Sequence, residues 1–230
     1  MLIDRDSLTN NLFSGMAAYS YAEDWSYWGY TWGWKANQLG QYVKYDPASA
    51  QKLLAAAGWD KNFTVELYFG TSTSGFLFNT GNAMAAMWNA AGIKTNITTT
   101  ADPVTATKVT QDASYPGLLL YYIFPPGIDP DSYTYLTMYS KAPQNIYHIN
   151  DPKIDQWCID ERHALNKQDR LKVLTDLMNY DLDQMTRIWV VNPYKINVRK
   201  PNLFNIVDNI DYWSVFGWGP IATDVAWKSS

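Results

Sequence analysis

The stretch YDPASAQKLLAAAGW, residues 45–59, carries the clearest secondary-structure signal in the chain. Asp46 is a residue type that caps helices, and Pro47 suits the first helical position. Gly58 suits the position just past a helix end. The segment therefore predicts a helix between Asp46 and Gly58. Its buried side is predicted to be formed by Leu53, Leu54 and Ala57.

A strand, a helix and a second strand are predicted to follow. Residues 63–69 (FTVELYF) alternate and are rich in β-formers, so they predict a strand. Residues 76–91 place apolar side chains at helical spacing and end before Gly92, and residues 93–99 (IKTNITT) predict the second strand. A strand, helix and strand in this order favour a right-handed crossover with parallel pairing.

The other predicted elements flank this unit on both sides. They are a helix over residues 4–13, a helix from Asp102 to about residue 112, a buried strand over 117–124, a turn-rich loop and short helix over 125–136, two helices over 150–165 and 166–185, and a strand over 187–198 that Pro193 should place at an edge or bend.

Composition excludes several classes of protein. The chain has 230 residues, 17% of them charged, and a formal charge of -4 without a cluster of Lys and Arg, so nucleic acid is not an expected partner. No apolar run is long enough for a transmembrane helix, and the N-terminus lacks the pattern of a signal peptide. Cys158 is the single cysteine and is expected to be a buried structural thiol. His148 and His163 have no metal-ligand spacing around them, so neither a metal nor another cofactor is expected.

Five segments resemble the extracellular solute-binding proteins of family 5, the oligopeptide and dipeptide class that serves ABC importers. The segments are IDRDSLTNNLFSG (3–15), YDPASAQKLLAAAGW (45–59), AMWNAAGIKTNI (86–97), DPDSYTYL (129–136) and NDPKIDQWCIDERHALNKQDRLKVLTDL (150–177). The resemblance covers most of residues 1–200, and the order of the five segments is more specific than any one motif.

The resemblance implies an α/β lobe of the type II periplasmic-binding-protein kind, a mixed sheet flanked by helices. Residues 1–200 would form the second lobe and residues 201–230 would return to the first, whose remainder has no counterpart here. The incomplete lobe could expose apolar surface and self-associate. Ligand would sit between two lobes that close by a hinge and would be presented to a membrane permease, in a periplasmic or extracellular, membrane-associated protein.

The DPD loop is the first candidate ligand site. In peptide-binding relatives an Asp three residues before this motif anchors the peptide's α-amino group, but that position is Pro126 here. Asp129 and Asp131 could stand in for the anchor, or they could serve as helix caps.

The run EDWSYWGYTWGWK, residues 23–35, is the second candidate and holds four of the eleven tryptophans. They are Trp25, Trp28, Trp32 and Trp34. Their spacing could form the buried face of a helix, but Gly29 and Gly33 disfavour one. Exposed rings could instead stack on a sugar, so an oligosaccharide is favoured slightly over a peptide as ligand.

The rival reading is a carbohydrate-active enzyme or an accessory sugar-binding module. Such an enzyme would need two carboxylates facing each other across a sugar. Glu23 and Asp24, the acids inside the aromatic run, are adjacent and would diverge, so a non-enzymatic binding protein is the expectation. A lobe that binds nothing measurable on its own is a third possibility.

Overall fold

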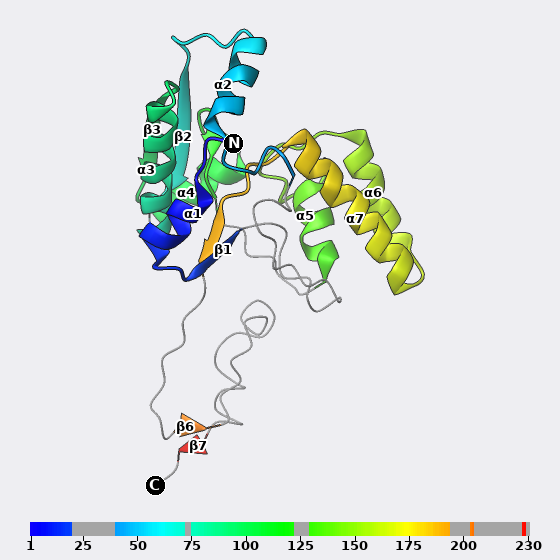
Figure 1. Ribbon diagram of the computed structural model, residues 1–230. Helices are drawn as coiled ribbons and strands as arrows, with labels where there is room; N and C mark the ends of the chain where they lie inside the picture. The colour runs from blue at the N-terminus through cyan, green and yellow to red at the C-terminus, as the bar shows by residue number, and fades with distance from the viewer. Residues whose placement is uncertain (20–39, 72–74, 122–128, 194–202, 205–226, 229–230) are drawn as a thin grey trace.

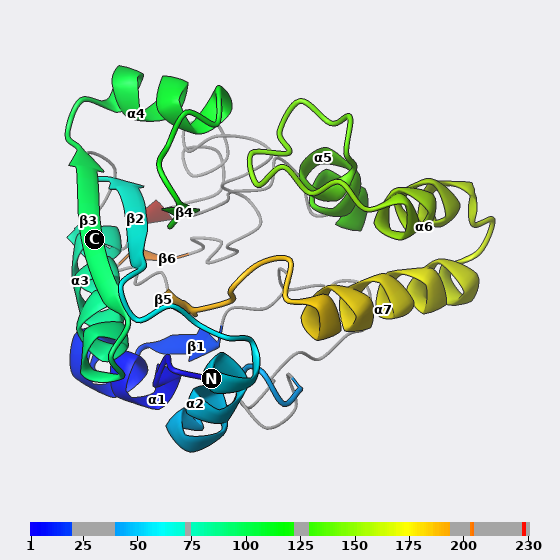
Figure 2. The same cartoon turned by 90° about the horizontal axis from the view of Figure 1, so that it is seen from above.

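The computed structural model describes residues 1–19, 40–71, 75–121, 129–193, 203–204 and 227–228 (Figure 1). Two groups of elements stand apart in it. A small sheet with its helices forms one group, and the helices gathered on the other side form the second, as the view from above shows (Figure 2). The mixed α/β composition agrees with the sequence-based prediction.

The first group is built on a parallel sheet. Its strand order is β3-β2-β4, with β2 at Thr64–Gly70, β3 at Lys94–Thr100 and β4 at Leu118–Leu119. Helix α3 (Gly75–Ala90) connects β2 to β3, and both it and α4 (Pro103–Gln111) pack against these two strands. The predicted parallel pairing is confirmed, because β2 pairs with β3 in parallel over its whole length.

Strand β4 departs from the prediction of a buried strand over residues 117–124. Only Leu118–Leu119 is in strand conformation within the described residues, paired with β2. Leu118 is 40% exposed and Tyr121 is 44% exposed, so burial was predicted wrongly for both. The physical reason is that, in the part of the chain that the structure describes, no strand pairs with the other edge of β4.

Helix α2 (Pro47–Ala56) forms where the sequence places it. The Asp46 side chain accepts a hydrogen bond from the Ser49 backbone N–H at 3.0 Å, and Gly58 ends the turn with φ +66°. The predicted buried side is partly wrong: Ala50 is buried and Leu54 half-buried, while Leu53 and Ala57 are exposed. These exposed residues border an open apolar hollow instead of packing against another element.

The start of the chain joins its later part. Helix α1 (Arg5–Ser7) continues as a π-helical segment, η1 (Leu8–Leu12), and strand β1 (Ala17–Tyr19) pairs antiparallel with β5 (Val191–Pro193). Pro193 lies opposite Ala17 at the end of this two-stranded sheet, as an edge position predicts.

Arg5 gives a structural role to the IDR motif, the Ile-Asp-Arg sequence at residues 3–5. Its side chain is 2% exposed and donates hydrogen bonds to three backbone carbonyls, those of Ile3, Val43 and Trp189. One buried guanidinium therefore ties together the first helix, the segment before α2 and the segment before β5.

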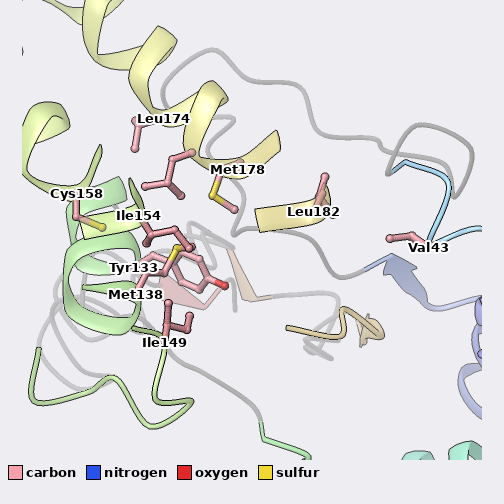
Figure 3. Packing of buried hydrophobic residues seen from close by; sticks show 10 residues of the cluster. Val43, Tyr133, Met138, Ile149, Ile154, Cys158, Leu174, Met178 and Leu182 are labelled. Carbon is pink, nitrogen blue, oxygen red and sulfur yellow. The ribbon is translucent and has the colours of Figure 1, made fainter. Parts of the chain in front are cut away.

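The helical group has its own core (Figure 3). It contains a short 3₁₀ helix, η4 (Pro130–Ser132), and helices α5 (Thr134–Met138), α6 (Pro152–His163) and α7 (Lys167–Gln184). Fully buried side chains at the centre include Met138, Ile154, Cys158, Leu174, Leu177 and Met178. Cys158 is thus the buried thiol that the sequence predicts, and burial raises its pKa to about 12.

Strands β6 (Leu203–Phe204) and β7 (Trp227–Lys228) pair antiparallel with each other. The remainder of residues 201–230, and with it the predicted apolar surface for self-association, lies outside the described residues.

Candidate functional site

The DPD loop begins the helical group, and Asp129 fixes its shape. The Asp129 carboxylate accepts a hydrogen bond from the Asp131 backbone N–H at 2.9 Å and so caps η4. It also forms a two-bond pair with the Arg170 guanidinium, at 3.0 Å to Nη1 and 2.5 Å to Nη2. Although burial opposes ionisation, these bonds outweigh it and lower the pKa of Asp129.

Glu161 of α6 lies behind Asp129 and shares the same arginine. Its side chain is 0% exposed, and Oε2 accepts a hydrogen bond from Arg170 Nε at 2.7 Å. The Thr134 hydroxyl lies 3.2 Å from Oε1. Burial raises the pKa of Glu161 to about 7, with Arg170 lowering it and the nearby Asp131 raising it. Arg170 therefore links the loop to helix α6 through two carboxylates.

Asp131 completes the network from the other side. Its carboxylate lies 2.8 Å from Arg162 Nε, and the Arg162 guanidinium sits 4.0 Å from the ring centre of Tyr135. Both acids of the DPD motif are thus engaged by arginines of the helical group. We call this set, Asp129, Asp131, Glu161, Arg162 and Arg170, the DPD network. It positions the loop rigidly on α6 and α7.

A hollow of about 340 Å³ lies between the sheet and the segment that leads into β5. Helix α3 lines it with Leu77, Thr80 and Met84, β4 and its neighbours line it from Gly117 to Tyr121, and the opposite wall runs from Met185 to Asn192. Tyr133 of the helical group also contributes. We call this space the β4 hollow; residues of both groups of elements line it.

One charged pair stands at the wall of the β4 hollow. Arg187 is 7% exposed and Asp181 is 0% exposed, and their side chains meet at 3.0 Å. Arg187 also donates to Tyr133 Oη at 2.8 Å, while Asp181 accepts from the Thr186 hydroxyl and, at 3.3 Å, from the indole N–H of Trp189. Burial alone would lower the pKa of Arg187, but Asp181 and Tyr133 outweigh it and the pKa is raised.

The structure does not test the predicted aromatic site. Trp25, Trp28, Trp32 and Trp34 lie outside the described residues, as does Pro126. The structure brings Asp129 and Asp131 together, and each faces an arginine, Arg170 and Arg162 respectively.

Both described histidines, His148 and His163, are exposed, and within the described residues no group of three His, Cys, Asp or Glu side chains is arranged to hold a metal ion. None of the described helices is long and apolar enough to cross a membrane.

The sequence model of the bacterial extracellular solute-binding proteins, family 5 Middle, matches residues 1–145. The chain belongs to this family. The predicted resemblance is therefore confirmed, and the matched region contains the IDR helix, the α2 segment, the whole parallel sheet and the DPD loop. Among curated proteins, none matches the chain.

Solved structures share the fold of this family 5 chain. One is the periplasmic binding protein DppA from Helicobacter pylori in complex with the peptide STSA, with a TM-score of 0.77 and 15% identity over 100% of this chain and 42% of that one. A second is the dipeptide-binding protein from Pseudoalteromonas sp. SM9913 in complex with Met-Leu, with a TM-score of 0.75 and 14% identity over 99% and 43% of the two chains. A third is NikZ from Campylobacter jejuni in complex with Ni(L-His), with a TM-score of 0.68 and 20% identity over 84% and 40%.

These likenesses show the fold, which confirms the type II periplasmic-binding-protein lobe expected from the sequence. The chain spans about two fifths of the length of each of these proteins, since it covers 42%, 43% and 40% of them.

Sequence reasoning did not single out the buried charges that organise both sites. A signal for them exists: Asp181 falls on the same helical stripe as Leu174 and Met178, and Glu161 falls on the stripe of Ile154 and Cys158. An acid at a buried-stripe position needs a cation or donors beside it, because an isolated buried charge is too costly. The sequence does not reveal which arginine supplies that cation.

Proposed function

We propose that this chain supplies one wall of the ligand cleft in the solute-binding component of an ABC importer. In this proposal residues 1–200 form the second lobe, and residues 201–230 return toward the first. The observation that carries the proposal is the family 5 match over residues 1–145, which ends just after the DPD loop and helix α5. The DPD network supports it, because a loop held by two arginines is a rigid surface for ligand.

The protein acts in this proposal by binding and release, with closure of two lobes over the solute and presentation to a permease. It works in the periplasm or outside the cell and is held near the membrane that carries the permease. The enzymatic alternative has no support from the comparisons, whose matching family is one of solute-binding proteins.

We propose a short peptide or a similarly small solute as the ligand. Two of the structural neighbours are complexes with peptides, STSA and Met-Leu, and a third is a complex with Ni(L-His). Because Pro126 replaces the acid expected to hold an α-amino group, the ligand is held by groups other than a carboxylate at that position.

An oligosaccharide is the second candidate, carried by the run that contains Trp25, Trp28, Trp32 and Trp34. Rings in such number suit the apolar faces of sugars. The comparisons lend no support to an oligosaccharide ligand, so the tryptophan run alone carries this candidate.

The test is a titration of the protein that comprises both lobes, followed by tryptophan fluorescence. The ligands are Met-Leu, a mixed tetrapeptide pool, and cello- and xylo-oligosaccharides. Saturable binding of peptides alone would remove the sugar candidate, and saturable binding of sugars alone would reverse the order. If neither class binds and a broader solute panel also fails, solute capture by this protein is refuted.

Parallel titrations of the 230-residue chain test the division into lobes. One wall of a cleft buries only part of a ligand, so we expect much weaker binding by this chain than by the two-lobed protein. Equal affinity of the two would contradict the assignment of residues 1–200 to a single wall.

A further inference from the structure

The β4 hollow has the size of a ligand pocket and two independent walls. Its volume, about 340 Å³, lies within the usual range for small-molecule sites. One wall belongs to the sheet and α3, and the other to residues 185–192, which lead into β5. Most of its lining is apolar or aromatic, including Leu67, Met84, Trp88, Tyr133 and Trp189.

Two residues that line the β4 hollow each carry a buried polar atom without a hydrogen-bond partner among the described residues. The two atoms are Nε of Arg187, a residue 7% exposed, and Oγ1 of Thr80, a residue 4% exposed. Buried donors without an acceptor are rare in folded proteins and call for an explanation. Here both residues line the same space, so one group entering it could satisfy both.

The remaining atoms of Arg187 define the charge that such a group must have. Its Nη1 and Nη2 are already directed at Tyr133 and Asp181, and the positive charge is matched by the buried Asp181 carboxylate. A cationic group would meet the guanidinium, and an anionic group would lose its hydration opposite a pair that is already neutral. A neutral group with an oxygen acceptor fits best.

We infer that the β4 hollow is a specificity pocket for an uncharged, mainly apolar group that carries a carbonyl or hydroxyl oxygen. The oxygen accepts the hydrogen bond of Arg187 Nε–H and pairs with the Thr80 hydroxyl, while the apolar part packs on Trp88, Tyr133 and Trp189. This inference deepens the proposed function and rests on it, since a captured solute with a neutral amide-bearing or hydroxyl-bearing side group would supply the occupant.

The Arg187 Nε–H resonance is the direct reporter for this pocket. We would titrate ¹⁵N-labelled protein with N-acetyl-L-leucinamide, which is neutral and has an apolar side chain and carbonyl oxygens. The comparison probes are N-acetyl-L-leucine, an anion, and N-acetyl-L-lysinamide, a cation. We expect a saturable shift of the Arg187 Nε–H signal with the neutral probe and weaker or no saturation with the charged ones.

Thr80→Val removes the second polar partner with little change of shape. We expect it to weaken the neutral probe about five- to tenfold, as for the loss of one hydrogen bond. Thr110→Val is the matched control, because Thr110 is also 4% exposed but does not line the β4 hollow. Should Thr80→Val fail to fold, Leu118→Trp replaces it: Leu118 is 40% exposed and lines the hollow, so a larger ring there should block the probe.

The absence of a saturable Arg187 shift would overturn the inference, as would stronger binding of a charged probe, an unchanged affinity in Thr80→Val, or an equal loss in Thr110→Val. The failure of the proposed function is distinguishable from this outcome. If peptides or sugars still bind the two-lobed protein while the Arg187 signal does not respond, only the pocket is refuted. If the neutral probe binds as expected and no solute binds the two-lobed protein, only solute capture is refuted.

Discussion

The buried pair Asp181–Arg187 allows a double-mutant cycle whose outcome can be worked out from the structure. Asp181→Leu removes a carboxylate that is 0% exposed, and leaves the Arg187 charge without its counter-ion. It also removes the carboxylate that accepts hydrogen bonds from the Thr186 hydroxyl and the Trp189 indole N–H. Arg187→Met removes the donor to the Tyr133 hydroxyl and to Met138 Sδ, a weak acceptor, while the Asp181 carboxylate keeps the Thr186 and Trp189 donors.

Removing one partner of a buried pair costs about 3–5 kcal/mol of unfolding free energy. We expect Asp181→Leu at the upper end of this range and Arg187→Met at the lower end, because the first change takes a charged acceptor from two donors, whereas the second leaves the Asp181 carboxylate with both. In the double variant no buried charge is left alone. Its loss should be smaller than the sum of the single losses by about 2–3 kcal/mol.

The assay is chemical denaturation followed by far-UV circular dichroism, which reports on the loss of helix in the whole chain. The control cycle uses Lys108 and Asp112, a pair on α4 whose side chains are 74% and 50% exposed, and there we expect a coupling of about 0.5 kcal/mol or less. Additive effects at Asp181 and Arg187, within about 0.5 kcal/mol, would refute the reasoning that these groups form one buried unit.

Three further outcomes follow from single residues. Because the pKa of Glu161 is raised from 4.5 to about 7, its ionisation disfavours the folded state, and the unfolding free energy should fall as the pH rises between these values. Urea titrations at several pH values should show this fall in the original protein and not in Glu161→Gln. An identical pH profile in both proteins would contradict the raised pKa of Glu161. Gly117→Ala should lower the unfolding free energy more than Gly58→Ala. Both glycines have φ +66°, but only at Gly117 would a Cβ lie 2.4 Å from the Glu66 carbonyl oxygen. Equal losses in denaturation would show that the positive φ accounts for the whole effect and the contact with Glu66 for none of it. Cys158, whose pKa burial raises to about 12, should resist a thiol reagent at neutral pH until the protein unfolds, and fast labelling of the folded protein would disprove its burial.

The DPD network bears on how the proposed cleft would work. A loop that is pinned by Arg162 and Arg170 does not need ligand to become ordered, so its binding surface would be prepared in advance. The same contacts occupy Asp129 and Asp131, which then serve the ligand through the position of the loop. Their expected role as direct ligand contacts stays a prediction, as does that of the four tryptophans.

Local sequence determined the elements. Asp46 and Asp102 each precede a proline at a helix start, and both cap the helices that follow in the structure. The alternation of residues 63–69 likewise produced β2. These predictions succeed because caps, prolines and periodic patterns act on neighbours in sequence, so a single chain segment contains the whole cause.

The sequence by itself also determined the family, through the order of its motifs, and with the family came the fold. The tertiary structure alone decided burial and partnership. Leu53 and Leu118 look like core residues and are exposed, while Asp181 and Glu161 look like surface residues and are buried. The reason is that burial depends on which distant element covers a side chain. Arg170 meets Asp129 across 41 positions, and Arg187 meets Tyr133 across 54, so no local pattern could reveal either contact.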